Sequence, residues 1–187
     1  MTDTEQPAPP WYDVKAHYDS GTADAQAVSL HWSAKLRTAI SLAESRLDAD
    51  TFAHSMRVSA LIEVGTDNTA GLKAMVVGVL HDLLEDQVRG QVVALWNLDV
   101  EFGEEVKDAV EVLTRPATTK MSYRDYIMDV STNDLATLVK IADLEDHLSK
   151  ANADTLRPTL RPRYERAWSQ LTAARAKSTC LTDGNRV

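Results

Sequence analysis

TAGLKAMVVGVLHDLLED, residues 69–86, is the most apolar stretch of the 187-residue chain, and it ends in ionisable side chains. Its apolar residues are nearly continuous rather than confined to one stripe, which is typical of a helix that is buried on every side. We therefore expect residues 69–86 to form the central helix of the fold, with the charged end at its rim.

The spacing of apolar residues favours helices elsewhere as well. They recur at intervals of three and four, the chain has only seven glycines, and alternating runs of β-branched and aromatic residues are missing. We predict one all-α domain of about seven to eight helices over 13–177, between flexible tails at 1–12 and 178–187. Asp50 or Thr51 is expected to cap the second helix. The predicted helices cover 23–47, 50–64, 69–86, 91–97, 103–113, 123–130, 133–148 and 161–177.

Composition and charge exclude several classes of function. The chain has 20 Lys and Arg against 28 Asp and Glu, a net charge of −8, whereas a protein that binds duplex nucleic acid needs a basic face. Cys180 is the single cysteine, which excludes a disulfide framework and a cysteine-based zinc site. No stretch has the pattern of a signal peptide or the length of a membrane span. We expect a soluble, cytoplasmic protein with no membrane partner.

His81, Asp82, Glu85 and Asp86 crowd the end of the most apolar helix. The i,i+4 spacing pairs His81 with Glu85 and Asp82 with Asp86, so all four lie on neighbouring turns. Three carboxylates at the negative end of a helix repel one another and lose solvation unless a cation compensates. A divalent metal ion is the simplest compensation, and a solvated acidic turn is the alternative.

His54 and Asp143 fit the same chemistry from two other predicted helices. Each of them alone is more often an ordinary rim or surface residue. Together with His81 and Asp82 they provide two imidazoles and two carboxylates, a donor set that suits Mn²⁺, Fe²⁺ or Zn²⁺ with open coordination positions. Open positions indicate catalysis by metal-activated water, and the acidic pair that follows His81-Asp82 is placed to orient that water or carry its proton.

The order His54, His81-Asp82, Asp143 resembles the H…HD…D signature of the HD-domain metal-dependent phosphohydrolases. More narrowly, VLHDLLED at 79–86 and VKIADL at 139–144 are similar to the LHDxxED and VKLAD motifs of RelA/SpoT-type hydrolase domains and stand-alone small alarmone hydrolases. The resemblance extends over about residues 35–175. It implies an all-α HD-domain bundle that removes the 3′-pyrophosphate from guanosine tetra- or pentaphosphate, usually with Mn²⁺.

The resemblance also implies roles for individual residues. The residues at the positions of metal ligands are His54, His81, Asp82 and Asp143, and those of the catalytic pair are Glu85 and Asp86. The expected substrate contacts are Arg46, Lys140, His147 and Tyr164, with a plain ion pair as the alternative for Lys140 and a core position as the alternative for Tyr164. Further basic residues that could neutralise a pyrophosphate are Arg57, Arg115, Lys120, Arg124 and Arg163.

Two departures from the family pattern bear on the substrate. Family members usually carry a basic, glycine-containing stretch and Tyr-x-x-His-Pro at the first ligand, a loop that helps hold the nucleotide. The corresponding segment of this chain, residues 46–55, is shorter than in the family and lacks both the glycine and the proline. His147 stands where the family usually has asparagine, so it could contact substrate, donate a proton or be a simple replacement.

These departures leave other functions open. One is an HD-domain nucleotidase that acts on the 5′-phosphates of (deoxy)nucleotides. Another is an antitoxin partner of an alarmone synthetase, which would act by contact alone. A small nucleotide is the expected ligand of both the alarmone hydrolase and the nucleotidase. A homo-oligomer or an alarmone-synthetase partner is compatible with the sequence.

Overall fold

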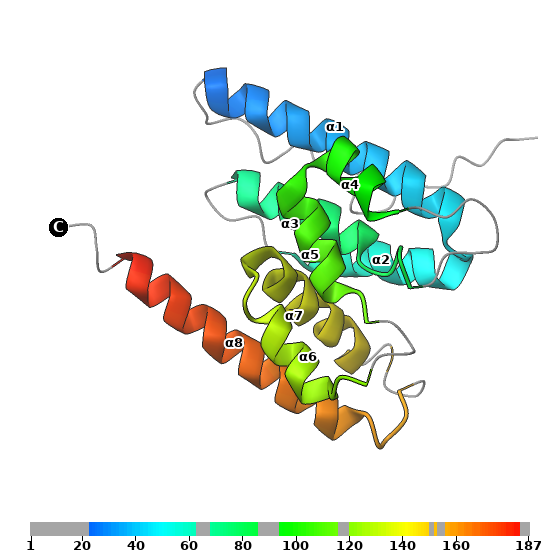
Figure 1. Cartoon of the computed structure of the whole chain (residues 1–187), viewed down its shortest axis with the longest axis vertical. Coiled ribbons are helices and arrows are strands. Elements are labelled where there is room, and N and C mark those ends of the chain that lie inside the picture. Colours follow the sequence, from blue (N-terminus) through cyan, green and yellow to red (C-terminus); the bar gives the residue numbers. More distant parts are fainter. Residues whose placement is uncertain are drawn as a thin grey trace, which may run out of the picture.

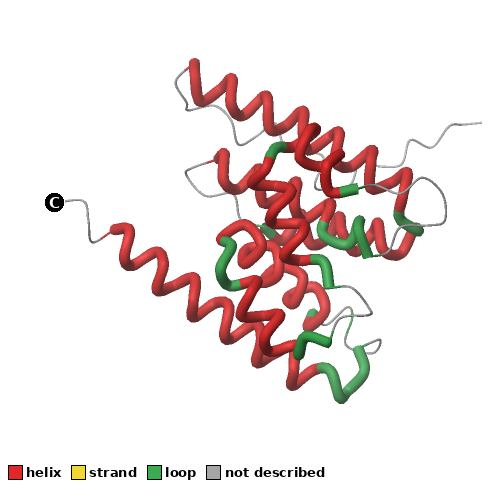
Figure 2. The backbone as a smooth tube through the Cα atoms, viewed as in Figure 1, coloured by secondary structure: helices red, strands yellow, loops and turns green. Residues whose placement is uncertain are grey.

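All the regular secondary structure that the computed structural model describes is helical (Figure 2). The described residues are 23–62, 68–85, 94–115, 120–149, 152 and 156–183. The predicted all-α fold is therefore confirmed. The helices are α1 (Ala23–Arg46), α2 (Ala49–Leu61), α3 (Asn68–Leu80), α4 (Leu95–Phe102), α5 (Glu104–Leu113), α6 (Tyr123–Val130), α7 (Asp134–Leu148) and α8 (Arg161–Asp183).

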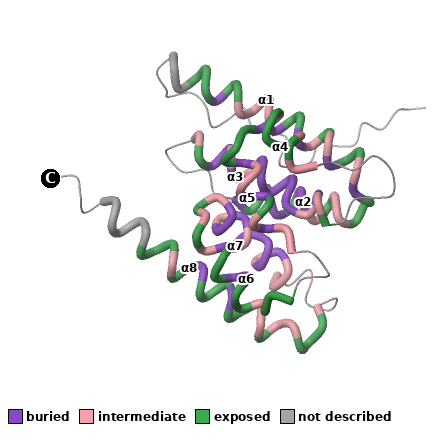
Figure 3. Tube along the Cα trace, in the orientation of Figure 1, coloured by how far each residue is buried: buried purple, intermediate pink, exposed green. Residues whose placement is uncertain are grey.

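Helix α3 is the centre of the bundle, as its apolar sequence predicts. It packs on α1, α2, α5 and α7, while α1 runs along one side of the molecule and α8 along the other (Figure 1). Its residues Val76, Val77, Val79 and Leu80 are fully buried, and the buried part of the chain is concentrated in the middle of the bundle (Figure 3). Among the described residues, no helix is long and apolar enough to cross a membrane.

The end of α3 differs from the prediction. The helix stops at Leu80 instead of continuing to residue 86, and residues 81–85 form turns. Short i+3 hydrogen bonds tighten this segment, from Leu83 N to Leu80 O (2.9 Å) and from Glu85 N to Asp82 O (3.2 Å). The His81 ring also bonds a carbonyl oxygen of the last helical turn, which side chains commonly satisfy at a helix end. Asp86 lies outside the described residues.

Helix α4 was predicted too early in the chain, at 91–97. The Asn97 side chain accepts a hydrogen bond from Ala94 N (3.0 Å), which fixes the start of the helix at Leu95. Gly103 ends the helix with a φ of 88°, a backbone conformation that side chains other than glycine rarely adopt. The glycine therefore separates α4 from α5, which begins one residue after the predicted start.

Capping residues set the other helix ends. Asp48, and not Asp50 or Thr51, caps α2, because its carboxylate accepts from Asp50 N (2.9 Å) and Thr51 N (3.0 Å). Asn133 caps α7 by accepting from Ala136 N (2.9 Å). Helix α8 continues to Asp183, past the predicted end at residue 177. The predicted tail at 1–12 lies outside the described residues.

Gly78 lets α2 and α3 approach closely. A Cβ atom on Gly78 would lie 3.0 Å from Ile62 Cδ1 and 3.1 Å from Ser59 Cα, so a larger residue would require its neighbours to shift by a few tenths of an ångström. His54 lies on α2 and His81 directly follows α3, so this close contact joins the two elements that carry the histidines.

Candidate metal centre

The predicted metal ligands come together from three parts of the chain. His54 extends from α2, His81 and Asp82 from the turn after α3, and Asp143 from α7. His54 Nε2 lies 3.1 Å from Asp143 Oδ1 and 3.8 Å from Asp82 Oδ2. His81 Nε2 lies 3.2 Å from Asp82 Oδ2 and 4.0 Å from Asp143 Oδ1. Two imidazole nitrogens and two carboxylates therefore surround one small volume.

The hydrogen bonds of His81 leave a lone pair facing this volume. His81 Nδ1 lies 2.8 Å from Gly78 O, and because a carbonyl oxygen only accepts, Nδ1 carries the proton. The other nitrogen, Nε2, is buried and has no hydrogen-bond partner within the described part of the chain. In the neutral ring this Nε2 presents a lone pair towards the carboxylate oxygens. That arrangement is unfavourable unless positive charge lies between them.

His54 is held by a carboxylate that the sequence analysis did not identify. Its Nδ1 lies 2.8 Å from Asp146 Oδ2, and Asp146 also accepts from Arg57 Nε (2.8 Å) and Arg57 Nη2 (3.1 Å). Asp146 follows Asp143 by three residues, and Arg57 follows His54 by three, so each lies on the same helix face as a predicted ligand. This spacing was the sequence signal that could have identified Asp146 as a partner of His54. Arg57 was expected only as a phosphate contact.

The charges of the centre favour a proton on His54 in the absence of other cations. Burial opposes the charged ring, but the hydrogen bond and charge of Asp143, with the hydrogen bond of Asp146, raise the pKa of His54 to about 9. Burial likewise opposes the charged carboxylate of Asp143. The Lys140 ammonium and the hydrogen bonds from His147 and His54 nevertheless hold the pKa of Asp143 well below its usual range. The carboxylates of the centre thus favour positive charge beside them.

The residues present fit a divalent cation. One ligand atom each from His54, His81 and Asp143 lies within 4.8 Å of the others, and Asp82 Oδ2 adjoins both imidazole nitrogens. Ligand atoms about 2.1 Å from one cation lie about 3 Å apart when adjacent and about 4 Å apart when opposite. The four distances between an imidazole nitrogen and a carboxylate oxygen, 3.1–4.0 Å, lie within this range. Imidazole and carboxylate donors suit a transition metal ion with borderline ligand preference.

Three of the predicted substrate residues adjoin the centre. Lys140 Nζ donates to Asp143 Oδ2 (2.7 Å), which is the ion pair considered as its alternative role. His147 Nε2 lies 3.2 Å from Asp143 Oδ1. The His147 ring lies near the rings of His54 and Tyr164, with centroids 4.8 Å and 5.4 Å away. Arg46 is the last residue of α1, and its substrate role stays a prediction.

Glu85 lies in the turn beyond Asp82 and faces a different part of the chain. Its carboxylate accepts a hydrogen bond from the backbone N–H of Arg115. The Arg115 guanidinium and the Lys140 ammonium lie 6.0 Å and 5.4 Å from the centroid of the same ring, Tyr126. The predicted catalytic pairing of Glu85 with Asp86 remains a prediction, because only Glu85 is among the described residues.

A cavity of about 360 Å³ opens beside the centre. One wall is His54 with Asp146 and Arg57, and His147 with Tyr164 supplies two aromatic faces. The exposed Arg157 adds a second guanidinium. The remaining lining residues are Asn152, Leu156 and Leu160. The cavity therefore combines cationic, aromatic and apolar surfaces next to the clustered histidines.

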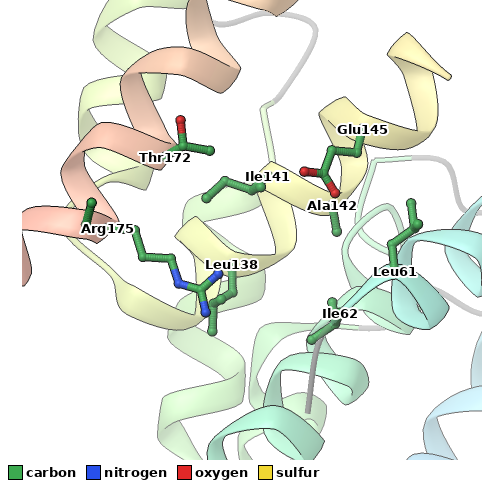
Figure 4. A pocket seen from close by; sticks show the side chains of 9 residues that line it. Leu61, Ile62, Leu138, Ile141, Ala142, Glu145, Thr172 and Arg175 are labelled. Carbon is green, nitrogen blue, oxygen red and sulfur yellow. The ribbon is translucent and has the colours of Figure 1, made fainter. Parts of the chain in front are cut away.

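A second cavity, of about 390 Å³, lies against the other side of α7 (Figure 4). Residues of α2, α7 and α8 form it, among them Ile62, Ile141 and Thr172. Its only carboxylate, Glu145, accepts a hydrogen bond from Trp168 Nε1 (3.0 Å). None of the clustered histidine and aspartate residues lines this groove.

The fold and the centre together define an all-helical protein that can hold a metal ion at His54, His81 and Asp143. A scan against protein-family models and a search of curated proteins both return no match to this chain. The family resemblance therefore depends on the motifs alone.

Proposed function

We propose that this protein is a metal-dependent phosphohydrolase. The substrate we propose is guanosine tetra- or pentaphosphate or a related nucleotide, from which the protein would remove the 3′-pyrophosphate. The observation that carries the proposal is the buried Nε2 of His81, which faces Asp82 beside His54 and Asp143 and has no hydrogen-bond partner among the described residues. Such a donor set is costly to bury unless it binds a cation.

The proposed cofactor is Mn²⁺, with Fe²⁺ or Zn²⁺ as alternatives of suitable ligand preference. His54, His81, Asp82 and Asp143 would hold it. When bound, a divalent cation would supply a Lewis acid that stabilises charge on a phosphoryl oxygen and acidifies water.

The residues around the centre support a phosphorylated, aromatic substrate. Tyr164 and His147 offer ring faces on which a nucleoside base could stack, and Arg57 and Arg157 are cations in the same cavity. About 360 Å³ falls in the range of small-molecule sites. Glu85 and Asp86 are the acids proposed to orient water and carry its proton. The acidic chain with one cysteine agrees with action in the reducing cytoplasm.

The connection before His54 favours a second candidate, an HD-domain nucleotidase acting on the 5′-phosphates of (deoxy)nucleotides. Only Leu47 and Asp48 link α1 to α2, and the Asp48 side chain is committed to capping α2. There is thus no extended basic loop at this point to hold a nucleotide bearing a 3′-pyrophosphate.

The test is product release from guanosine tetraphosphate by metal-stripped protein, with and without added Mn²⁺. We expect pyrophosphate and guanosine 5′-diphosphate only with the metal, loss of both in Asp82→Ala, and no change in Asp129→Ala, an exposed carboxylate on α6. Phosphate release from deoxynucleotides, with guanosine tetraphosphate left intact, would favour the second candidate. Absence of turnover for every nucleotide would refute both enzymes.

A further inference from the structure

His54 and His81 are oriented by different chemical groups. The Nδ1 of His81 donates to a neutral backbone carbonyl, Gly78 O, at 2.8 Å. The Nδ1 of His54 lies 2.8 Å from a charged carboxylate, Asp146 Oδ2. Both rings therefore direct Nε2 into the centre, but only His54 depends on an ionised side chain for this orientation.

Asp146 is itself held firmly. It is a buried residue, and both of its carboxylate oxygens accept hydrogen bonds from the forked guanidinium of Arg57. Asn152 Nδ2 adds contacts to Asp146 Oδ2 (3.2 Å) and to Asp146 O (2.7 Å). A bidentate pair of this kind fixes direction as well as distance. The Asp146 carboxylate is thus a rigid acceptor for His54.

We propose that Asp146, held by Arg57, is a positioning residue that keeps the Nε2 lone pair of His54 on the metal centre. The carboxylate accepts a hydrogen bond from the Nδ1–H group of His54, which leaves Nε2 free to bind a cation. This hydrogen bond also makes Nε2 a more basic ligand. This inference rests on the metal centre of the proposed function, although it does not depend on which nucleotide is hydrolysed.

A purely structural ion pair between Arg57 and Asp146 would have different consequences. It would contribute to the free energy of unfolding but would leave metal affinity and the state of the His54 ring unchanged. Measurements on the bound metal therefore separate positioning from simple stabilisation.

The first measurement is the dissociation constant for Zn²⁺ and for Mn²⁺, obtained by competition with a chelator on the full-length chain. Asp146→Ala should weaken binding by about 10- to 100-fold, the usual effect of losing such a partner of a ligand histidine. Asp146→Asn keeps an acceptor for Nδ1 but loses the charge, so its loss should be smaller. Arg57→Ala should act in the same direction as Asp146→Ala, again with a smaller effect. Glu145→Ala is the matched control, since it removes the carboxylate before Asp146 that faces the other cavity.

The second measurement is the NMR signal of the His54 Nδ1 proton in the Zn²⁺-loaded protein. We expect a slowly exchanging proton in the original chain and in Glu145→Ala, and its loss in Asp146→Ala. If Asp146→Ala does not fold, Asp146→Asn and Arg57→Ala provide the same comparison.

Unchanged affinity and an unchanged proton signal in folded variants would overturn the inference, as would an original chain that binds neither metal. Metal binding that weakens in the Asp146 variants would support it even if no nucleotide is hydrolysed. In that case the proposed function would fail while the positioning role stands.

Discussion

The two sides of α7 border cavities of nearly the same size, about 360 Å³ beside His54 and about 390 Å³ against α8. Towards the first cavity the helix presents Asp146 and His147, one turn after Asp143. Towards the second it presents Leu138, Ile141, Ala142 and Glu145 (Figure 4).

The two sides of α7 differ in how many ionisable side chains contact one another there. On the first side, Asp143 and Asp146 each contact several charged or polar side chains, and a buried nitrogen of His81 beside them has no hydrogen-bond partner within the described ranges. On the second side, Glu145 accepts a hydrogen bond from Trp168 at the surface. Cavity volume therefore does not distinguish the two sides of α7, whereas the arrangement of their ionisable groups does.

Asp143→Ala should have the largest effect, because it removes a metal ligand and leaves the Lys140 ammonium without its partner. Loss of one member of a buried ion pair typically costs about 3–5 kcal/mol. We expect metal binding to become undetectable by calorimetry and the free energy of unfolding in urea to fall by that amount. Retention of full metal affinity would show that the polar side of α7 is not the metal centre.

Leu144→Ala tests the neighbouring position, a fully buried apolar side chain. Removing it should cost about 2–5 kcal/mol through lost contacts and the cavity that remains. Metal affinity of the folded fraction should stay within about twofold of the original, because no ligand or ligand partner changes. A large loss of affinity at full folding would mean that packing and metal binding on α7 are not separable.

Acidity should weaken metal binding on the polar side, because the metal must displace the proton of His54. With a pKa of about 9 for His54, metal affinity should rise about tenfold per pH unit between pH 6.5 and 8.5. Dissociation constants in matched buffers measure this slope. A flat profile would show that metal binding releases no proton from the centre.

Protonation of His54 also affects the stability of the metal-free protein, which should fall as the pH rises, whereas metal affinity should increase. A raised pKa means that the contribution of His54 to stability is complete below its unfolded value of about 6.5, and is lost as the pH rises through about 9. Urea unfolding of the metal-stripped protein should therefore show lower stability at pH 9.5 than at pH 6.5. His54→Gln should reduce this difference.

Ile141→Val should have the smallest effect, because it removes one buried methylene beside the groove. We expect a loss of about 0.5–1.5 kcal/mol in the free energy of unfolding and no change in metal affinity or turnover. Urea titration measures the free energy of unfolding, calorimetry measures metal affinity, and product release measures turnover. Impaired turnover would assign the groove a role that its lining does not suggest.

Local sequence signals were sufficient for much of the fold. Helix α6 has the predicted bounds, and α7 begins one residue after the prediction because Asn133 serves as its cap. The end of α3 could not be predicted from periodicity, because apolar residues continue to Leu84 while the His81 side chain bonds back to Gly78 O. A helix end of this kind depends on a side-chain contact that apolar spacing does not encode.

The candidate site was predictable where its residues belong to short motifs. His54, His81, Asp82 and Asp143 were identified in this way and lie together. Asp146 was missed because an acidic residue near a helix end usually faces solvent, and its partner Arg57 lies 89 positions away in the chain. Pairings of that range depend on how α2 and α7 pack and are not visible in either segment alone.

The missing side chain at Gly78 has a consequence for how this centre could be altered. Ser59 and Ile62 occupy the space that a methyl group would need, and the carbonyl of the same glycine anchors His81. A methyl group at Gly78 would thus require a shift of a few tenths of an ångström where the elements that carry the two imidazoles meet. Gly78→Ala therefore tests, from a position that contributes no ligand, how strongly the spacing of the two histidines governs cation binding.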